Sequence, residues 1–212
     1  MSDDRVALHE PFQKTAQQHD ADMMGMYVLV ATEILLFGGL FAAIYVVRLT
    51  HPAEVVEASK KLHLWIGAIN TAVLLTSSLG VALAVQASRR GAVRQTVACL
   101  LGAAALGVGF LGIKAYEYGR EYADGLLPAV SDPERFSTPV EHLFMDLYLV
   151  STGLHAVHVT IGILVLSFFA WRVGSRRLTL PRHAVSVEVA GVYWHLVDIV
   201  WVLLYPALYL VR

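Results

Sequence analysis

The chain has 212 residues, of which 57% are hydrophobic and 16% are charged, and this apolar excess predicts a membrane protein. The formal net charge of -1 excludes the basic surface that a nucleic-acid partner would need. A single cysteine, Cys99, excludes an internal disulfide framework and the paired thiolates of a dinuclear copper centre.

The first 22 residues are polar and acidic, without the basic start and short apolar core of a cleavable signal. We expect residues 1–22 to form a polar cytoplasmic segment, so that the first membrane helix acts as its own insertion signal. Residues 23–212 show no internal repeat and no boundary between domains. They are expected to form one transmembrane domain.

Five apolar runs are each long enough to cross a hydrocarbon core of about 30 Å, which takes about 20 helical residues. The sequence therefore predicts an all-α membrane protein, a bundle of five transmembrane helices. Between the third and fourth helices, glycines and prolines predict an irregular loop from Gly119 to Val140. The expected helices cover residues 23–47, 62–85, 96–118, 143–171 and 186–211.

The basic residues of the loops predict the orientation. The second and fourth loops carry seven arginines and no acidic residue, whereas the other loops carry five basic residues diluted by six acidic ones. Because Lys and Arg favour the cytoplasmic side, we expect the N-terminus inside and the C-terminus outside. The seven arginines are Arg89, Arg90, Arg94, Arg172, Arg176, Arg177 and Arg182.

Small residues recur at helical spacing in two of the expected helices. Gly102, Ala105, Gly109 and Gly112 would form one stripe, and Gly38 and Ala42 lie four residues apart in the first helix. Small side chains let membrane helices approach closely. These positions are expected to lie in the seams between helices.

Polar residues near the middle of the membrane form an expected layer. At 1.5 Å per residue, they lie roughly 12 to 22 Å from the starts of their helices. A charged residue at this depth costs about 2.5 to 3.5 kcal/mol on the insertion scale, so such groups should face the protein interior and find partners. The layer consists of Glu33, Asn70, His155, His158, His195 and Asp198.

His195 and Asp198 are three residues apart on one helix face, which predicts a local pair of histidine and carboxylate. Three hypotheses compete for the layer as a whole. It could lock the helices in register or anchor lipid or a neighbouring subunit, which is the favoured one, or it could carry protons. In the third, His142 and His155 would ligate haem, but no second histidine pair exists for a two-haem site.

Two long segments resemble a known family. Residues 193–201 read YWHLVDIVW, and residues 152–162 read TGLHAVHVTIG. They resemble the Y-W-H-x-V-D-x-V-W and T-G-x-H-x-x-H-V-x-x-G segments of subunit III of the haem-copper oxidases. Shorter matches occur at Thr32-Glu33, at Asn70-Thr71 and at Glu117-Tyr118. The likeness covers nearly everything from Gly25 onward.

The chain differs from longer family members, which have two further helices before the helix that contains the glutamate. It therefore resembles the five-helix short form, and a lipid site built against those two helices would be lost. The resemblance implies a non-redox core subunit of a respiratory terminal oxidase in a bacterial inner membrane. Such a subunit supports the assembly, stability and proton uptake of the catalytic subunit in aerobic electron transport.

The resemblance also implies partners and cofactors. We expect contact with catalytic subunit I and with subunit II of a cytochrome c or quinol oxidase, and with phospholipid. No cofactor, metal or catalytic residue is expected in this chain, because haem and copper would lie in the partner subunits. Glu117, Trp194 and Trp201, which belong to the matched segments, are expected to contact lipid or a neighbouring subunit.

Two other functions remain open at this point. The chain could be an accessory subunit of a nitric oxide reductase, whose five-helix members share the pattern. It could also be a stand-alone transporter of protons or small solutes, given the titratable groups in the membrane.

Overall fold

The computed structural model describes residues 15–125 and 138–211, and every regular element within them is an α-helix. Five of the helices are long and apolar enough to cross a membrane, which confirms the predicted fold class. A short helix, α2, separates the first two of them. The elements are α1 (Thr15–Thr50), α2 (Pro52–Lys60), α3 (Leu64–Arg89), α4 (Val93–Ala123), α5 (Pro139–Gly174) and α6 (Ala184–Tyr209).

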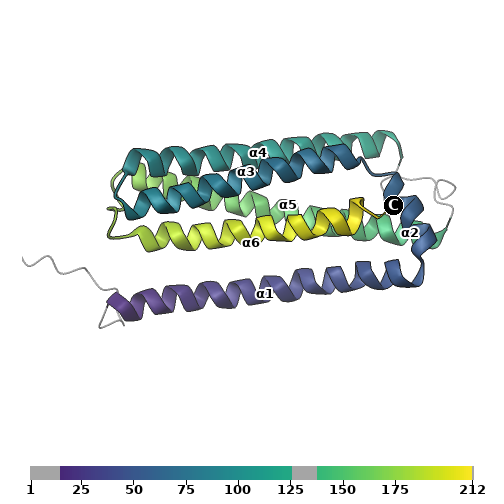
Figure 1. Ribbon diagram of the computed structural model, residues 1–212, viewed down its shortest axis with the longest axis horizontal. Coiled ribbons are helices and arrows are strands. Elements are labelled where there is room, and N and C mark those ends of the chain that lie inside the picture. The colour runs from purple at the N-terminus through teal and green to yellow at the C-terminus, as the bar shows by residue number, and fades with distance from the viewer. Residues whose placement is uncertain (1–14, 126–137, 212) are drawn as a thin grey trace, which may run out of the picture.

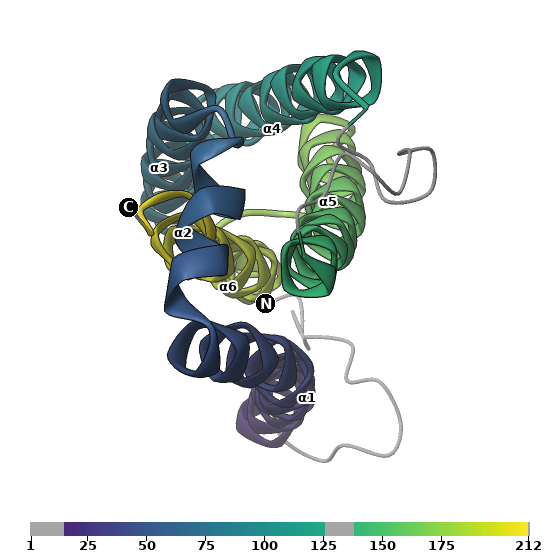
Figure 2. The same ribbon diagram turned by 90° about the vertical axis from the view of Figure 1, so that its right-hand side faces the viewer.

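Helices α3 to α6 form a four-membered bundle, and α1 lies outside it (Figure 1). Seen along the bundle, α3, α4, α5 and α6 follow one another around a ring, while α2 lies across one end (Figure 2). Helix α1 packs against α5 and α6, so most of its surface remains exposed. In a membrane that exposed surface would face lipid or another protein.

Helix α6 has the largest buried share of the five long helices. Its Trp194, Trp201 and Tyr209 are almost fully buried, and Tyr148 of α5 is buried beside them. These four aromatic side chains fill the space between the helices of the bundle. Their polar atoms need partners there, since lipid and apolar side chains offer none.

Local sequence signals explain several helix ends. Thr138 caps α5 by accepting a hydrogen bond from the Glu141 backbone N–H at 3.3 Å, and Pro139 occupies the first turn. Gly91, between α3 and α4, has a φ of +73°. That left-handed backbone suits a residue without a Cβ atom, and it lets the chain reverse in a short turn.

Three helices, α1, α4 and α5, extend at both ends beyond the ranges that hydropathy predicts. Helix α1 already begins at Thr15, α4 continues to Ala123, and α5 starts at Pro139, so the expected loop from Gly119 to Val140 is shorter than predicted. Residues 1–14 and 126–137 lie outside the described residues. An apolar run ends at the first charged residues, whereas the backbone hydrogen bonds of a helix can continue through them. Helix α2 is short and contains charged residues, so the search for apolar runs did not predict it.

The prediction for the small-residue stripe is wrong within this chain. A Cβ atom added at Gly38, Gly102, Gly109 or Gly112 would have no described atom within 4 Å, so these glycines face outward. Close approaches occur at other glycines, Gly67, Gly107 and Gly162, which lie against aromatic rings of α6. Spacing alone identifies a stripe on a helix but not the side on which the helix packs.

The two arginine-rich turns lie at the same end of the bundle, as the sequence predicts (Figure 1). They join α3 to α4 and α5 to α6, and α1 begins at this end. Arg89 pairs there with Glu188 of α6 at 2.8 Å. The remaining arginines of these turns give that end a positive charge.

Candidate functional site

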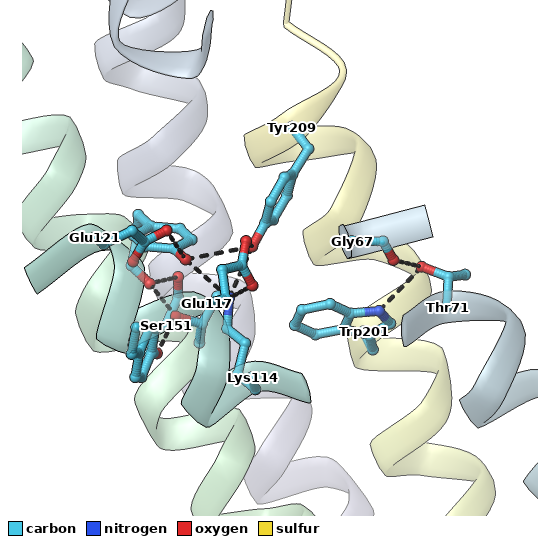
Figure 3. Close-up of polar contacts among 11 residues, drawn as sticks. Gly67, Thr71, Lys114, Glu117, Glu121, Ser151, Trp201 and Tyr209 are labelled. Atoms are coloured by element: carbon cyan, nitrogen blue, oxygen red, sulfur yellow. Dashed lines mark hydrogen bonds and ion pairs between the residues drawn. The ribbon is translucent and has the colours of Figure 1, made fainter. Parts of the chain in front are cut away.

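A buried charged cluster lies between α4, α5 and α6, centred on Lys114 (Figure 3). The Lys114 Nζ atom donates to Glu117 Oε2 at 2.8 Å, to the Tyr148 hydroxyl at 2.9 Å and to the Tyr209 hydroxyl at 2.7 Å. An ammonium group has three N–H donors, so all three are used. Lys114 is only 2% exposed and Glu117 is fully buried, so these bonds replace all of their hydration.

The hydroxyl groups of the two tyrosines also hydrogen-bond to carboxylates. The Tyr209 hydroxyl donates to Glu117 Oε1 at 2.9 Å, and the Tyr148 hydroxyl donates to Glu121 Oε1 at 2.7 Å. Each phenol therefore accepts from the ammonium and donates to a carboxylate. Because Tyr148 belongs to α5 and Tyr209 to α6, the network fastens three helices together. One positive group faces two carboxyl groups.

Aromatic rings complete the surroundings of Lys114. Its Nζ lies 4.9 Å from the Tyr118 ring centre and 5.5 Å from that of Trp201, within the range of cation–π attraction. The Tyr118 hydroxyl is 2.6 Å from Thr152 Oγ1. A charge in such a site is stable only with its partners in place, so the cluster should act as a structural lock.

Glu33 of α1 meets His158 of α5 within the apolar spans of the two helices. The two contacting atoms, Glu33 Oε2 and His158 Nε2, are 2.9 Å apart. The other ring nitrogen, Nδ1, lies 2.8 Å from the Leu154 carbonyl oxygen and must donate to it, because a carbonyl only accepts. A favourable contact at Nε2 then requires one proton between the imidazole and the carboxyl group. The pair links α1 to the bundle.

His155 lies one turn earlier on the same helix but points into the bundle. It is fully buried, stacked on Trp201 with ring centres 5.2 Å apart and edge-on to Phe110 at 5.6 Å. Neither ring nitrogen has a hydrogen-bond partner among the described residues. The side-chain amide of Asn70 is equally buried and also lacks a described partner.

The expected pair of His195 and Asp198 takes a different form. His195 Nδ1 is 2.6 Å from Ser78 Oγ of α3, and Ser78 also interacts with the Asp198 carboxyl group, so a hydroxyl from another helix joins the two residues. Asp198 is 6% exposed, and its Oδ1 atom has no hydrogen-bond partner among the described residues. Ser78 was not recognised from the sequence, because its hydroxyl comes from a helix more than a hundred residues away.

The predicted layer is therefore not one connected network. Glu33, His158 and His155 line one small cavity, whereas His195 lies with Ser78 at the interface of α3 and α6. Counting residues along each helix predicts that these side chains lie at equal depth. Which of them come into contact depends on the direction in which each side chain points around its helix, and the packing of the helices sets that direction.

The three residues expected at lipid or subunit contacts lie inside the bundle. Glu117 and Trp201 are fully buried, and Trp194 is 1% exposed. Trp201 Nε1 donates to Thr71 Oγ1 at 3.0 Å, and Trp194 fits between Gly107 and Gly162. Burial within the chain argues against direct contact with lipid. The expected contact of these three residues with lipid or a neighbouring subunit stays a prediction, and the geometry does not favour it.

No group of three or more His, Cys, Asp or Glu side chains among the described residues is arranged to hold a metal ion. The two histidines considered for haem are engaged differently: His142 pairs with Asp146 at 3.0 Å, and His155 is enclosed by aromatic rings.

The Lys114 cluster is not among the residues that the sequence predicts as a site. A signal was present, because Lys114, Glu117 and Glu121 are spaced three and four residues apart and share one helix face. The expected helix ended at residue 118, so Lys114 and Glu117 lay close to its end and Glu121 lay beyond it. Nothing local indicated the two tyrosines, which come from other helices.

Comparisons with known proteins agree with the fold. The family model described as cytochrome c oxidase subunit III matches residues 12–211. The chain is 34% identical to a protein of Thermostichus vulcanus named cytochrome c oxidase subunit 3, over 92% of this chain and 90% of that protein.

Other relatives are named as parts of other oxidases. A quinol oxidase subunit 3 of Bacillus subtilis is 27% identical over 94% of this chain and 92% of its own length. A haem-copper oxidase subunit I+III of Aeropyrum pernix is 30% identical over 96% of this chain, which spans 24% of that longer protein. With a family match over nearly its whole length, the chain belongs to the cytochrome c oxidase subunit III family.

Proposed function

We propose that the chain is a non-redox subunit that docks onto the catalytic subunit of a haem-copper oxidase and supports its assembly, stability and proton uptake. Haem and copper lie in the partner subunits, and subunit II completes the core. The complex resides in a bacterial inner membrane, with the arginine-rich end of this chain on the cytoplasmic side.

The observation that carries the proposal is the combination of family membership with the fused relative. In the Aeropyrum pernix protein, named subunit I+III, a region like this chain is covalently joined to more than its own length of other sequence. Such a fusion is compatible with function where the two parts lie side by side. The same contact, made between separate chains, would hold this subunit against subunit I.

The polar groups inside the bundle support a structural role. Lys114, Glu117, Tyr148 and Tyr209 bond to one another, leaving the ammonium no spare donor for a substrate. Such a network makes a rigid body of α4, α5 and α6, which is what a docked scaffold needs. The titratable pair of Glu33 and His158 lies instead at the edge of the bundle, where it could serve proton uptake.

Phospholipid fits the groove between α1 and α6. This groove has a volume of about 460 Å³ and is almost wholly apolar, with His195 as its polar member. Because α1 stands apart from the ring of the other helices, the groove lies on the outside of the bundle (Figure 2). Its size and apolar lining suit part of an acyl chain. Its lining includes Val30, Ile34, Phe41, Leu196, Ile199 and Leu203.

Purification through an affinity tag on this chain tests the association. From native membranes in mild detergent, we expect a haem- and copper-containing subunit to elute with it, together with oxygen-reducing activity. A partner that reduces nitric oxide but not oxygen would favour the accessory subunit of a nitric oxide reductase. A colourless homo-oligomer would contradict the proposal and favour a stand-alone transporter.

A further inference from the structure

A small, partly enclosed cavity lies where α1, α5 and α6 meet. Its volume is about 10 Å³, close to that needed for the centre of one water molecule. A buried water persists where two to four polar groups can bond to it. The lining contains three such side chains among apolar ones: Glu33, His155 and His158 with Phe37, Leu196, Val197 and Val200.

His155 needs a partner that the described protein atoms do not supply. Its side chain is fully buried, and both ring nitrogens lack a described hydrogen-bond partner. Trp201 and Phe110 fix the ring by stacking and edge contact, but the Trp201 N–H is already bonded to Thr71 and Phe110 has no polar side-chain atom. An imidazole always carries at least one N–H donor, and a buried donor without an acceptor is rare in folded proteins.

Glu33, which also lines the cavity, has a carboxyl oxygen that can accept a hydrogen bond. Its Oε2 atom is 2.9 Å from His158 Nε2, yet the contact lacks the alignment of a hydrogen bond, and Oε2 is buried. A carboxyl oxygen has two lone pairs, so Oε2 can accept from a further donor beside the histidine. His158 Nδ1 is already committed to the Leu154 carbonyl, which holds the ring in place.

We propose that this cavity holds one ordered water molecule, hydrogen-bonded to Glu33 Oε2 and to a ring nitrogen of His155. Water fits because it can donate to the carboxyl oxygen and either donate to or accept from the imidazole. It joins Glu33 of α1 to His155 inside the bundle. The site thus supplies polar contacts at the seam where α1 attaches.

A density map of the intact complex at a resolution that shows internal waters is the direct test. We expect a peak at about 2.7 to 3.2 Å from both Glu33 Oε2 and a His155 nitrogen. The proposal is overturned if other internal waters are resolved and this position shows no peak. It is equally overturned if His155 has instead turned to bond a protein atom.

Two variants test the same water by infrared spectroscopy with ¹⁸O-labelled water. Val197→Ile enlarges an apolar side chain of the cavity lining, and His155→Phe keeps an aromatic ring on Trp201 while removing the nitrogens. We expect an isotope-sensitive O–H band in the parent protein that both variants lose. Val202→Ile, at an exposed position on the same helix, should retain it. An unchanged band in both cavity variants would contradict the site.

Discussion

Lys114→Met should destabilise the protein by about 3 to 5 kcal/mol, the usual cost of removing one partner from a buried ion pair. The change takes away the ammonium that bonds Glu117, Tyr148 and Tyr209. Glu117 stays fully buried, and among the described residues the Tyr209 hydroxyl is its remaining side-chain donor. Unfolding in mild detergent, followed by tryptophan fluorescence, measures the loss, because Trp201 lies beside the cluster.

Two controls separate charge burial from loss of packing. The double variant Lys114→Met/Glu117→Gln removes both charges, so it should be more stable than the single variant. Lys60→Met breaks an exposed pair with Glu57 on α2, where solvent screens the attraction, and should change little. A single variant as stable as the parent would show that the cluster does not lock the bundle.

Gly162→Ala should destabilise the protein by about 1 to 3 kcal/mol through overpacking. An added Cβ atom would lie 2.8 Å from Trp194 Cε3 and also 2.8 Å from Cζ3. The indole cannot move away easily, because a Cβ atom at Gly107 on α4 would lie only 2.7 Å from its Cη2 atom. The ring thus occupies a slot whose two walls are glycines of neighbouring helices.

Gly153→Ala is the matched control, because it lies on the same helix. A Cβ atom there would have no described atom within 4 Å, so the variant should be neutral or gain up to about 1 kcal/mol from reduced chain entropy. Thermal unfolding of both variants in one detergent compares them directly. Equal stability of the two would mean that Trp194 does not require the small residue at Gly162.

The sequence predicted the helices better than their contacts. Apolar runs identify spans directly, since a membrane requires about 20 apolar residues whatever lies beside them. Partners such as Ser78 for His195, or Tyr209 for Lys114, depend on how each helix is rotated. Long-range packing sets that rotation, and no local spacing records it. The outward-facing stripe at Gly109 and Gly112 shows the same limit.

Part of the candidate site was predicted from the sequence and part was not. Glu33, His155 and His158 were recognised because polar residues inside an apolar span are costly, and the structure brings these three to one cavity. Lys114 escaped because the hydropathy window placed it close to the end of its span. In the structure α4 continues nine residues beyond it, to Ala123, so Lys114 lies well inside the helix.

Oxygen uptake by the complex with and without this chain tests the central claim most directly. The purified catalytic subunit should retain its haem and copper when the chain is absent, because the proposed function assigns both cofactors to the partner subunits. We predict a nearly normal initial rate that declines faster over successive turnovers, and restored stability when the chain is added back. The account would be contradicted if oxygen reduction were lost at once while haem and copper were retained. It would also be contradicted if the rate declined no faster without the chain than with it.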